Sequence, residues 1–102
     1  MTDVKTILVG TVGQGIMRSA DGGENWGRIG IGAGLHSDAI VRYMLNRPTS
    51  PEIVFAGTDK GLYRSDDAGK TWNQVDSPMN DYSVWALAAD PGDPNLMFAG
   101  TG

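Results

Sequence analysis

Short apolar stretches, separated by turns rich in glycine, proline and aspartate, run along the whole chain. Such stretches predict β-strands, because an amphipathic helix needs a longer segment with a period of about 3.6 residues. The segment 84–89 (VWALAA) has helical propensity, but its match to 40–46 and the Asp-Pro that follows it favour a strand. The chain is therefore predicted to be all-β, with strands at 6–11, 15–19, 26–29, 40–46, 53–58, 61–65, 71–75, 84–89 and 96–101.

One polar turn segment occurs twice, at 19–26 (SADGGENW) and at 65–72 (SDDAGKTW), with an offset of 46 residues (65 − 19). A fixed period of about 20–50 residues is typical of a repeat architecture. Aspartate accepts backbone N–H bonds in a tight turn, glycine adopts positive φ without strain, and tryptophan offers a large apolar surface for packing. The matched residues are Ser19, Asp21, Gly23 and Trp26 in one copy and Ser65, Asp67, Gly69 and Trp72 in the other.

This Ser-x-Asp-x-Gly-x-x-Trp pattern resembles the Asp-box, or BNR repeat, of sialidase-like β-propellers, sortilin-type receptors and many bacterial proteins labelled glycosyl hydrolases. The likeness extends upstream, since 55–58 (FAGT) precedes 61–65 (GLYRS) as 8–11 (LVGT) precedes 15–19 (GIMRS). The resemblance implies that each box forms the turn between the third and fourth strands of a propeller blade. There its aspartate shapes the turn on the face opposite the catalytic one, and its tryptophan packs between blades rather than against a sugar.

The strand order predicts an incomplete propeller of about two blades plus part of a third. Blades have about 40–45 residues and about 4–8 of them close a ring, so 102 residues are too few for a whole propeller. We expect a partial blade at 1–29, a complete blade at 40–75 and the start of the next at 83–102. Unpaired strand edges are templates for pairing. The chain is therefore expected to be the N-terminal part of a longer propeller or, alternatively, a module that associates with other copies of itself.

The chain contains no cysteine and has a net charge of −4. It therefore has no disulfide framework and no thiolate nucleophile, and it lacks the clustered basic face of a nucleic-acid binder. Residues 1–6 do not resemble a signal peptide, and no segment approaches the roughly 20 apolar residues of a membrane helix. We expect no cofactor, no nucleic acid and no membrane among the partners. The sequence does not identify the cellular compartment, but the cytoplasm is favoured because neither a signal peptide nor cysteine is found.

The resemblance also implies where a functional surface would lie. Sialidase-like enzymes work on the face opposite the boxes, which here corresponds to the loops 30–39 and 76–83 and the turns 12–14 and 59–60. The candidate binding residues on this face are His36, Asp38, Asp59, Lys60, Asp76, Asp81 and Tyr82.

Two pairs among these candidates could carry chemistry. His36 and Asp38 could form a proton-transfer pair or half of a metal site, although a solvated loop with Asp38 capping a turn is favoured. Asp76 and Asp81 could be the two carboxylates of a glycoside hydrolase, but aspartate is common in turns for local reasons. No catalytic residue and no metal site are therefore predicted.

Further enzyme patterns are absent from the sequence. The resemblance to sialidases implies an Arg triad, yet Arg18 and Arg64 belong to the repeat itself, and no nucleophile elbow or phosphate-binding loop occurs. Arg42, Tyr43 and Trp85, on inner strands, could line the channel or pack between blades. The favoured function is a non-catalytic scaffold or recognition module for a protein or carbohydrate ligand. The alternative is part of a sialidase-like or other glycoside hydrolase whose catalytic residues lie mostly outside this chain.

Overall fold

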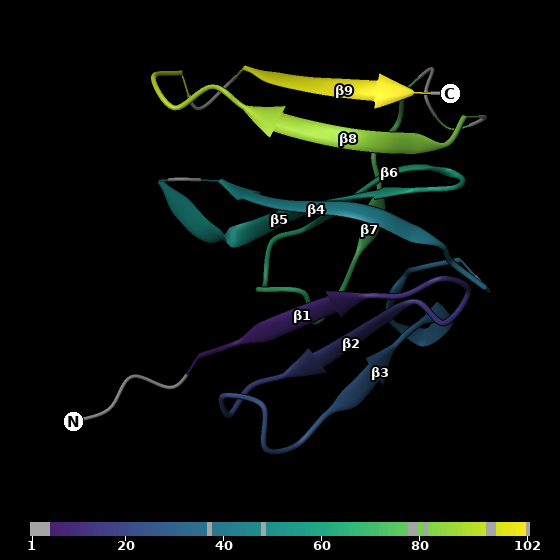
Figure 1. Ribbon diagram of the computed structural model, residues 1–102, viewed down its shortest axis with the longest axis vertical. Helices are drawn as coiled ribbons and strands as arrows, with labels where there is room; N and C mark the ends of the chain where they lie inside the picture. The colour runs from purple at the N-terminus through teal and green to yellow at the C-terminus, as the bar shows by residue number, and fades with distance from the viewer. Residues whose placement is uncertain are drawn as a thin grey trace.

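Three antiparallel β-sheets, stacked one above another, make up the fold (Figure 1). The computed structural model describes residues 5–36, 38–47, 49–77, 80, 82–93 and 96–101. The first sheet contains β1 (Ile7–Gly10), β2 (Ile16–Ser19) and β3 (Gly27–Ile29), and the short 3-10 helix η1 (Ile31–Ala33) follows it. The second sheet contains β4 (Val41–Arg47), β5 (Ser50–Thr58), β6 (Gly61–Ser65) and β7 (Asn73–Gln74). The third pairs β8 (Val84–Ala89) with β9 (Met97–Thr101).

This architecture confirms the all-β prediction. The sheets of three, four and two strands lie within the ranges 1–29, 40–75 and 83–102. The strand predicted at 84–89, in preference to a helix, is also confirmed.

Two strand boundaries were predicted wrongly. Strand β5 begins at Ser50, so Pro51 lies inside a strand and not between strands. The β4–β5 register shifts between Asn46 and Arg47, and such an irregularity accommodates a proline that cannot donate to the ladder. Strand β7 is shorter than the predicted 71–75, because the N–H of Trp72 donates out of the sheet to the carbonyl of Ala33.

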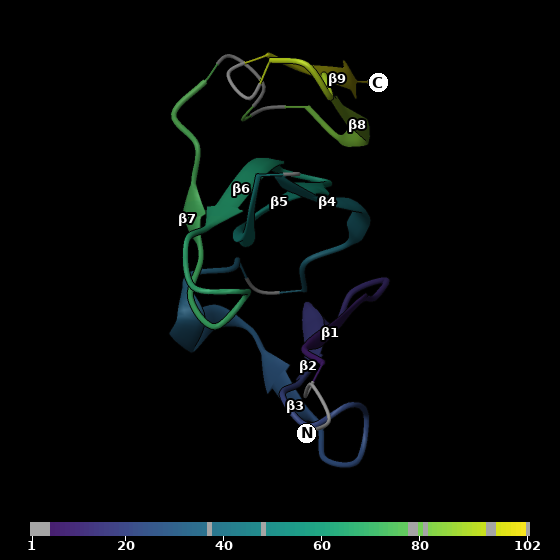
Figure 2. The same cartoon turned by 90° about the vertical axis from the view of Figure 1, so that its left-hand side faces the viewer.

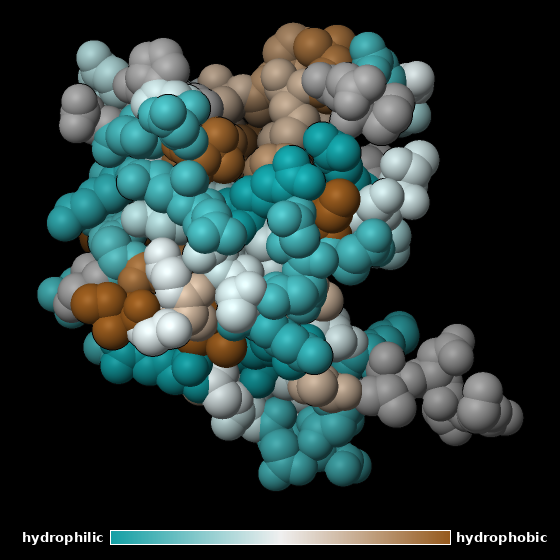
Figure 3. Space-filling view, turned by 180° about the vertical axis from the view of Figure 1, so that it is seen from behind, coloured by the Kyte–Doolittle hydropathy of each residue, from teal (hydrophilic) through white to brown (hydrophobic). Residues whose placement is uncertain are grey.

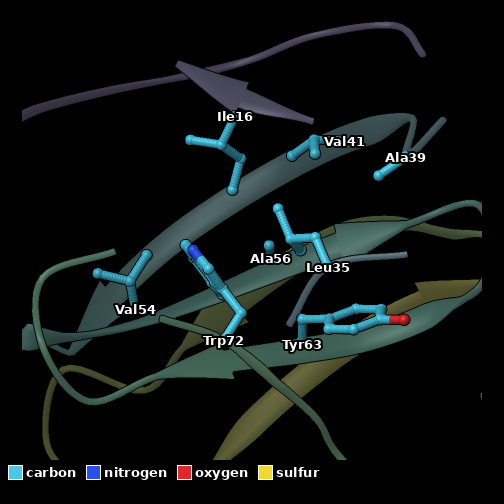
Figure 4. Close-up of a cluster of buried hydrophobic side chains, with 8 residues drawn as sticks. All are labelled: Ile16, Leu35, Ala39, Val41, Val54, Ala56, Tyr63 and Trp72. Carbon is cyan, nitrogen blue, oxygen red and sulfur yellow. The ribbon is translucent and has the colours of Figure 1, made fainter. Parts of the chain in front are cut away.

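Apolar side chains fill the two spaces between the sheets. Between the first and second sheets lie Ile16, Leu35, Ala39, Val41, Val54, Ala56, Tyr63 and Trp72 (Figure 4). Between the second and third sheets lie Phe55, Leu62, Val84 and Leu87. Figure 2 shows the same three layers from the side. Each sheet therefore buries its apolar surface against its neighbour, as the units of a repeat protein do.

The two repeated turns have matching hydrogen bonds. Ser19 Oγ and Ser65 Oγ each donate at 2.8 Å to the Oδ1 of the aspartate two residues later. Each serine oxygen also accepts the N–H of the repeat glycine at 2.8 Å. In both turns the indole Nε1–H donates at 2.9 Å to the carbonyl of that glycine. The two turns are thus structurally equivalent.

Their tryptophans differ in burial. Trp72 is 2% exposed because it packs against the preceding sheet, which contributes Ile16 to the same cluster. Trp26 is 43% exposed, since no described sheet precedes its own. The predicted packing of Trp26 between blades is therefore not present in this chain.

Strands β4 and β8 share a bulge at the same position. The β4–β5 register shifts between Val41 and Tyr43, and the β8–β9 register shifts between Val84 and Ala86, 43 residues later (84 − 41). Side chains three residues apart face opposite sides of a regular strand. Here Val41 and Met44 pack in one cluster, and Val84 and Leu87 share the other. In each strand the bulge therefore places two residues, where a regular strand has one, between two side chains that face the same side.

Candidate functional site

One turn in each of the first two sheets contacts the loop that leads into the first strand of the next sheet. This happens at the turn 11–15 with the loop before β4, and at the turn 59–61 with the loop before β8. The N–H groups of Gly13 and Gly15 donate to the carbonyl of Ala39 at 3.1 and 3.2 Å. The N–H of Gly61 donates in the same way to the carbonyl of Tyr82 at 3.0 Å. Backbone hydrogen bonds therefore hold the predicted candidate loops together at one end of the stack.

His36, Asp59 and Tyr63 form a hydrogen-bonded group at this end. His36 Nε2 lies 2.9 Å from Asp59 Oδ1, and His36 Nδ1 lies 3.1 Å from the Tyr63 hydroxyl. In a neutral imidazole with this arrangement, Nε2–H donates to the carboxylate and Nδ1 accepts the tyrosine proton. Asp59 Oδ1 also accepts the N–H of Ile40 at 3.1 Å. Two protein donors therefore orient the Asp59 carboxylate.

The environment favours an ionised Asp59. Burial on its own raises the pKa of this carboxyl, but the hydrogen bonds from the Ile40 N–H and from His36, and the positive charge that His36 has when protonated, together lower it below its ordinary value. The pKa of Tyr63 is raised by burial and by the nearby Asp59 charge, so its hydroxyl stays protonated as a donor. At neutral pH the group thus presents a fixed carboxylate whose side chain is 22% exposed.

A hollow of about 290 Å³ adjoins this group. His36, Gly15, Arg28, Gly30 and Ile31 line it, so it lies between the first sheet and the loop that leaves it. The Arg28 guanidinium is tethered there, since its Nε donates to the carbonyl of Gln14 at 3.0 Å. The hollow therefore borders His36, whereas Asp59 is not among its lining residues.

The other predicted candidates are less closely associated. Lys60 and Tyr82 flank Asp59 on the same rim, with Tyr82 55% exposed. Asp38 is exposed at a φ of 58°, and Asp76 is exposed in its loop. Asp81 lies outside the described residues. The structure therefore joins His36 to Asp59 and not to Asp38, the pairing considered from sequence.

Sequence reasoning missed Tyr63 as a member of this group. It lies on β6 in the repeated segment, where its equivalent in the first sheet is Met17 (63 − 46). A polar ring in place of an apolar side chain at one repeat position is the only signal that could have identified it.

Among the described residues, no cluster of three or more His, Cys, Asp or Glu side chains could hold a metal ion. Within those same ranges, no helix has the length and apolarity needed to cross a bilayer.

The chain is similar in sequence to fungal enzymes. It is 33% identical over 104 residues to a xyloglucanase of Hypocrea jecorina, covering 99% of this chain and 12% of that protein. It is 33% identical over 99 residues to a probable oligoxyloglucan-reducing end-specific xyloglucanase of Neosartorya fischeri, covering 86% of this chain and 12% of the relative. The chain is also 29% identical over 108 residues to an oligoxyloglucan-reducing end-specific xyloglucanase of Emericella nidulans. This match covers 94% of this chain and 13% of the relative.

One solved structure supports the fold. The crystal structure of an ancestral GH74 enzyme superposes with a TM-score of 0.77 at 23% sequence identity, covering 97% of this chain and 12% of that one. No family model matches the chain. The likeness shows a propeller-like stack of antiparallel sheets, and the chain spans about an eighth of the length of the proteins it matches.

Proposed function

We propose that residues 1–102 belong to a β-propeller glycoside hydrolase that acts on xyloglucan. The similarity to the Hypocrea jecorina xyloglucanase, which extends over nearly the whole chain, carries this proposal. It favours the hydrolase alternative drawn from the sequence over the non-catalytic scaffold. The remaining blades of the propeller are the expected partners of this segment.

Asp59 is the residue that we expect to act on the substrate. Most glycoside hydrolases use two carboxyl groups, one as the general acid and the other as base or nucleophile. The hydrogen bonds from His36 and the Ile40 N–H keep Asp59 ionised and oriented, which suits the base or nucleophile. The general acid, which needs a raised pKa, would then come from another part of the protein.

We also propose that the two repeated turns are Asp-boxes with a structural role. Their matching Ser–Asp–Gly–Trp hydrogen bonds support this assignment. Both carboxylate oxygens of Asp21 and of Asp67 accept hydrogen bonds within the turn, which makes these residues poor candidates for catalysis.

The activity of the full-length protein on different polysaccharides tests the proposal. We expect it to release oligosaccharides from xyloglucan, detected as new reducing ends and by mass spectrometry, with little action on a sialoside. Release of sialic acid would reject xyloglucan as the substrate, and no product from any β-glucan or sialoside at any pH would reject the hydrolase function in favour of the scaffold.

A further inference from the structure

The bulges of the two inner strands bring Arg42 and Trp85 together. Arg42 and Trp85 occupy equivalent positions in successive sheets, 43 residues apart (85 − 42). The Arg42 guanidinium carbon lies 3.7 Å from the centroid of the Trp85 ring, well within the distance of a cation–π contact. The contact therefore holds the guanidinium against the Trp85 ring at the inner edge of the sheets.

The Arg42 side chain has a buried donor without a protein acceptor. Its Nε is buried and makes no hydrogen bond within the described part of the chain. The ion pairs found among the described residues are His36–Asp59 and Arg64–Asp66, so no carboxylate neutralises Arg42 there. A buried donor without an acceptor is costly, and the guanidinium can still donate from its terminal nitrogens to an acceptor-rich ligand.

Two exposed aromatic residues adjoin Arg42, one in contact with its guanidinium and the other next to it in sequence. Trp85 is 52% exposed and Tyr43, the neighbour of Arg42 in the bulge, is 45% exposed. A hollow of about 430 Å³ opens beside Arg42 and Tyr43, and it is lined by Gly10, Val41, Arg42, Tyr43 and Met44 but not by Trp85. The inner edge thus combines aromatic rings, a fixed donor group and open volume.

We propose that Arg42, Tyr43 and Trp85 form a binding subsite for a neutral pyranose unit of a β-glucan chain. A pyranose ring has an apolar C–H face that packs on an aromatic ring and a rim of hydroxyl oxygens that accept from a guanidinium. Aromatic packing combined with a few fixed polar groups is the usual composition of a small-molecule site. The choice of ligand rests on the proposed function, but the residues of the subsite are separate from the His36–Asp59 group.

Exposed apolar side chains of the third sheet are a weaker candidate for a binding surface. Figure 3, the view from behind, shows apolar colour at the upper end of the molecule, where β8 and β9 lie. Leu96, the residue before the last strand, and Phe98, within that strand, are 41% and 60% exposed. Nothing in the described part of the chain indicates what would bind these side chains.

Calorimetric titration of the full-length protein with a thio-linked, non-hydrolysable xyloglucan oligosaccharide tests the subsite. We expect Trp85→Ala and Arg42→Ala each to weaken binding about tenfold. Trp26→Ala, which removes a tryptophan that lies outside the subsite, should leave the affinity unchanged. Arg42→Lys keeps the charge but loses the planar stack, so it should behave like Arg42→Ala.

Because Trp85→Ala could unfold the third sheet, each variant is melted in parallel, and Arg42→Lys decides the result if it does. Unchanged affinity in the folded Arg42→Lys variant, no binding by the wild type, or tighter binding of a glucuronic-acid-containing oligosaccharide would overturn the proposal. If the protein hydrolyses xyloglucan but the variants bind the oligosaccharide as the wild type does, the subsite is rejected and the hydrolase function is retained. If the variants weaken binding but the protein does not hydrolyse xyloglucan, the subsite is retained and the hydrolase function is rejected.

Discussion

The backbone N–H of Trp72 donates to the carbonyl of Ala33 at 2.7 Å. This bond joins the last strand of the second sheet to the loop that leaves the first. It places the Trp72 indole, 2% exposed, in the cluster between the two sheets. Contact between sheets therefore involves backbone and side chain at the same residue.

The residue after Ala33 should tolerate no side chain. Gly34 has a φ of 102°, and a Cβ added there would lie 1.9 Å from the Trp72 carbonyl oxygen. We expect Gly34→Ala to lower the free energy of unfolding by more than about 3 kcal/mol, combining backbone strain with the clash. Gly13→Ala is the control, because its φ is also positive but no atom lies within 4 Å of the added Cβ. It should cost about 1–2 kcal/mol in urea unfolding. Equal costs for the two variants would contradict the close approach.

The two repeat tryptophans should differ in their contribution to stability. Trp72→Ala removes a buried ring and should cost about 3–5 kcal/mol. Trp26→Ala removes a ring that is 43% exposed in this chain, so it should cost about 1 kcal/mol. Denaturant unfolding of both variants measures the difference. If Trp26→Ala proves as costly as Trp72→Ala in the 102-residue chain, the packing described here is wrong.

Trp26 should be covered in the full-length protein. Trp72 packs on the sheet before its own, and the equivalent Trp26 lacks such a sheet among the described residues. In a closed ring a further blade would occupy that place. Hydroxyl-radical footprinting should therefore find Trp26 oxidised rapidly in the 102-residue chain and slowly in the full-length protein. Rapid oxidation in both would argue against ring closure over this face.

The repeated turns should weaken in acid. Hydrogen bonds from the Thr71 side chain and N–H lower the pKa of Asp67 from 3.8 to about 2, and the Asn25 N–H and side chain do the same for Asp21. A lowered folded-state pKa contributes stability that is complete above about pH 4 and is lost as the pH falls towards 2. Melting temperatures should therefore fall across this window. Asp67→Asn should be less stable than the wild type near neutral pH and show a shallower decline in acid, while exposed Asp76→Asn should follow the wild type.

The fold was predictable from sequence because its main signals are local. Each repeated turn is closed by bonds that span at most four residues, such as Gly69 N–H to Ser65 Oγ, so the residues themselves define it. The strand at 84–89 could be predicted from its repeat match. The bulges were missed, although the three-residue spacing of Val41 and Met44, where alternation expects two, was a usable signal.

The site was only partly predictable because its contacts join distant segments. His36 and Asp59 were both candidates, but their 23-residue separation gave no reason to pair them. The contact of Arg42 with Trp85 depends on how far one sheet lies from the next, which no local pattern records. The exposure of Trp26 depends on which blades are present, so its repeat position alone predicted the wrong burial.

Hydrolysis of xyloglucan by the full-length protein and its Asp59→Asn variant tests the central claim most directly. Asparagine keeps the size of the side chain but removes its charge, and loss of a base or nucleophile should reduce kcat by at least about 100-fold. Asp76→Asn, which alters an exposed loop aspartate, is the matched control and should keep wild-type kcat. Equal activity of wild type and Asp59→Asn, with both folded by melting temperature, would contradict the assignment of this carboxylate to the reaction.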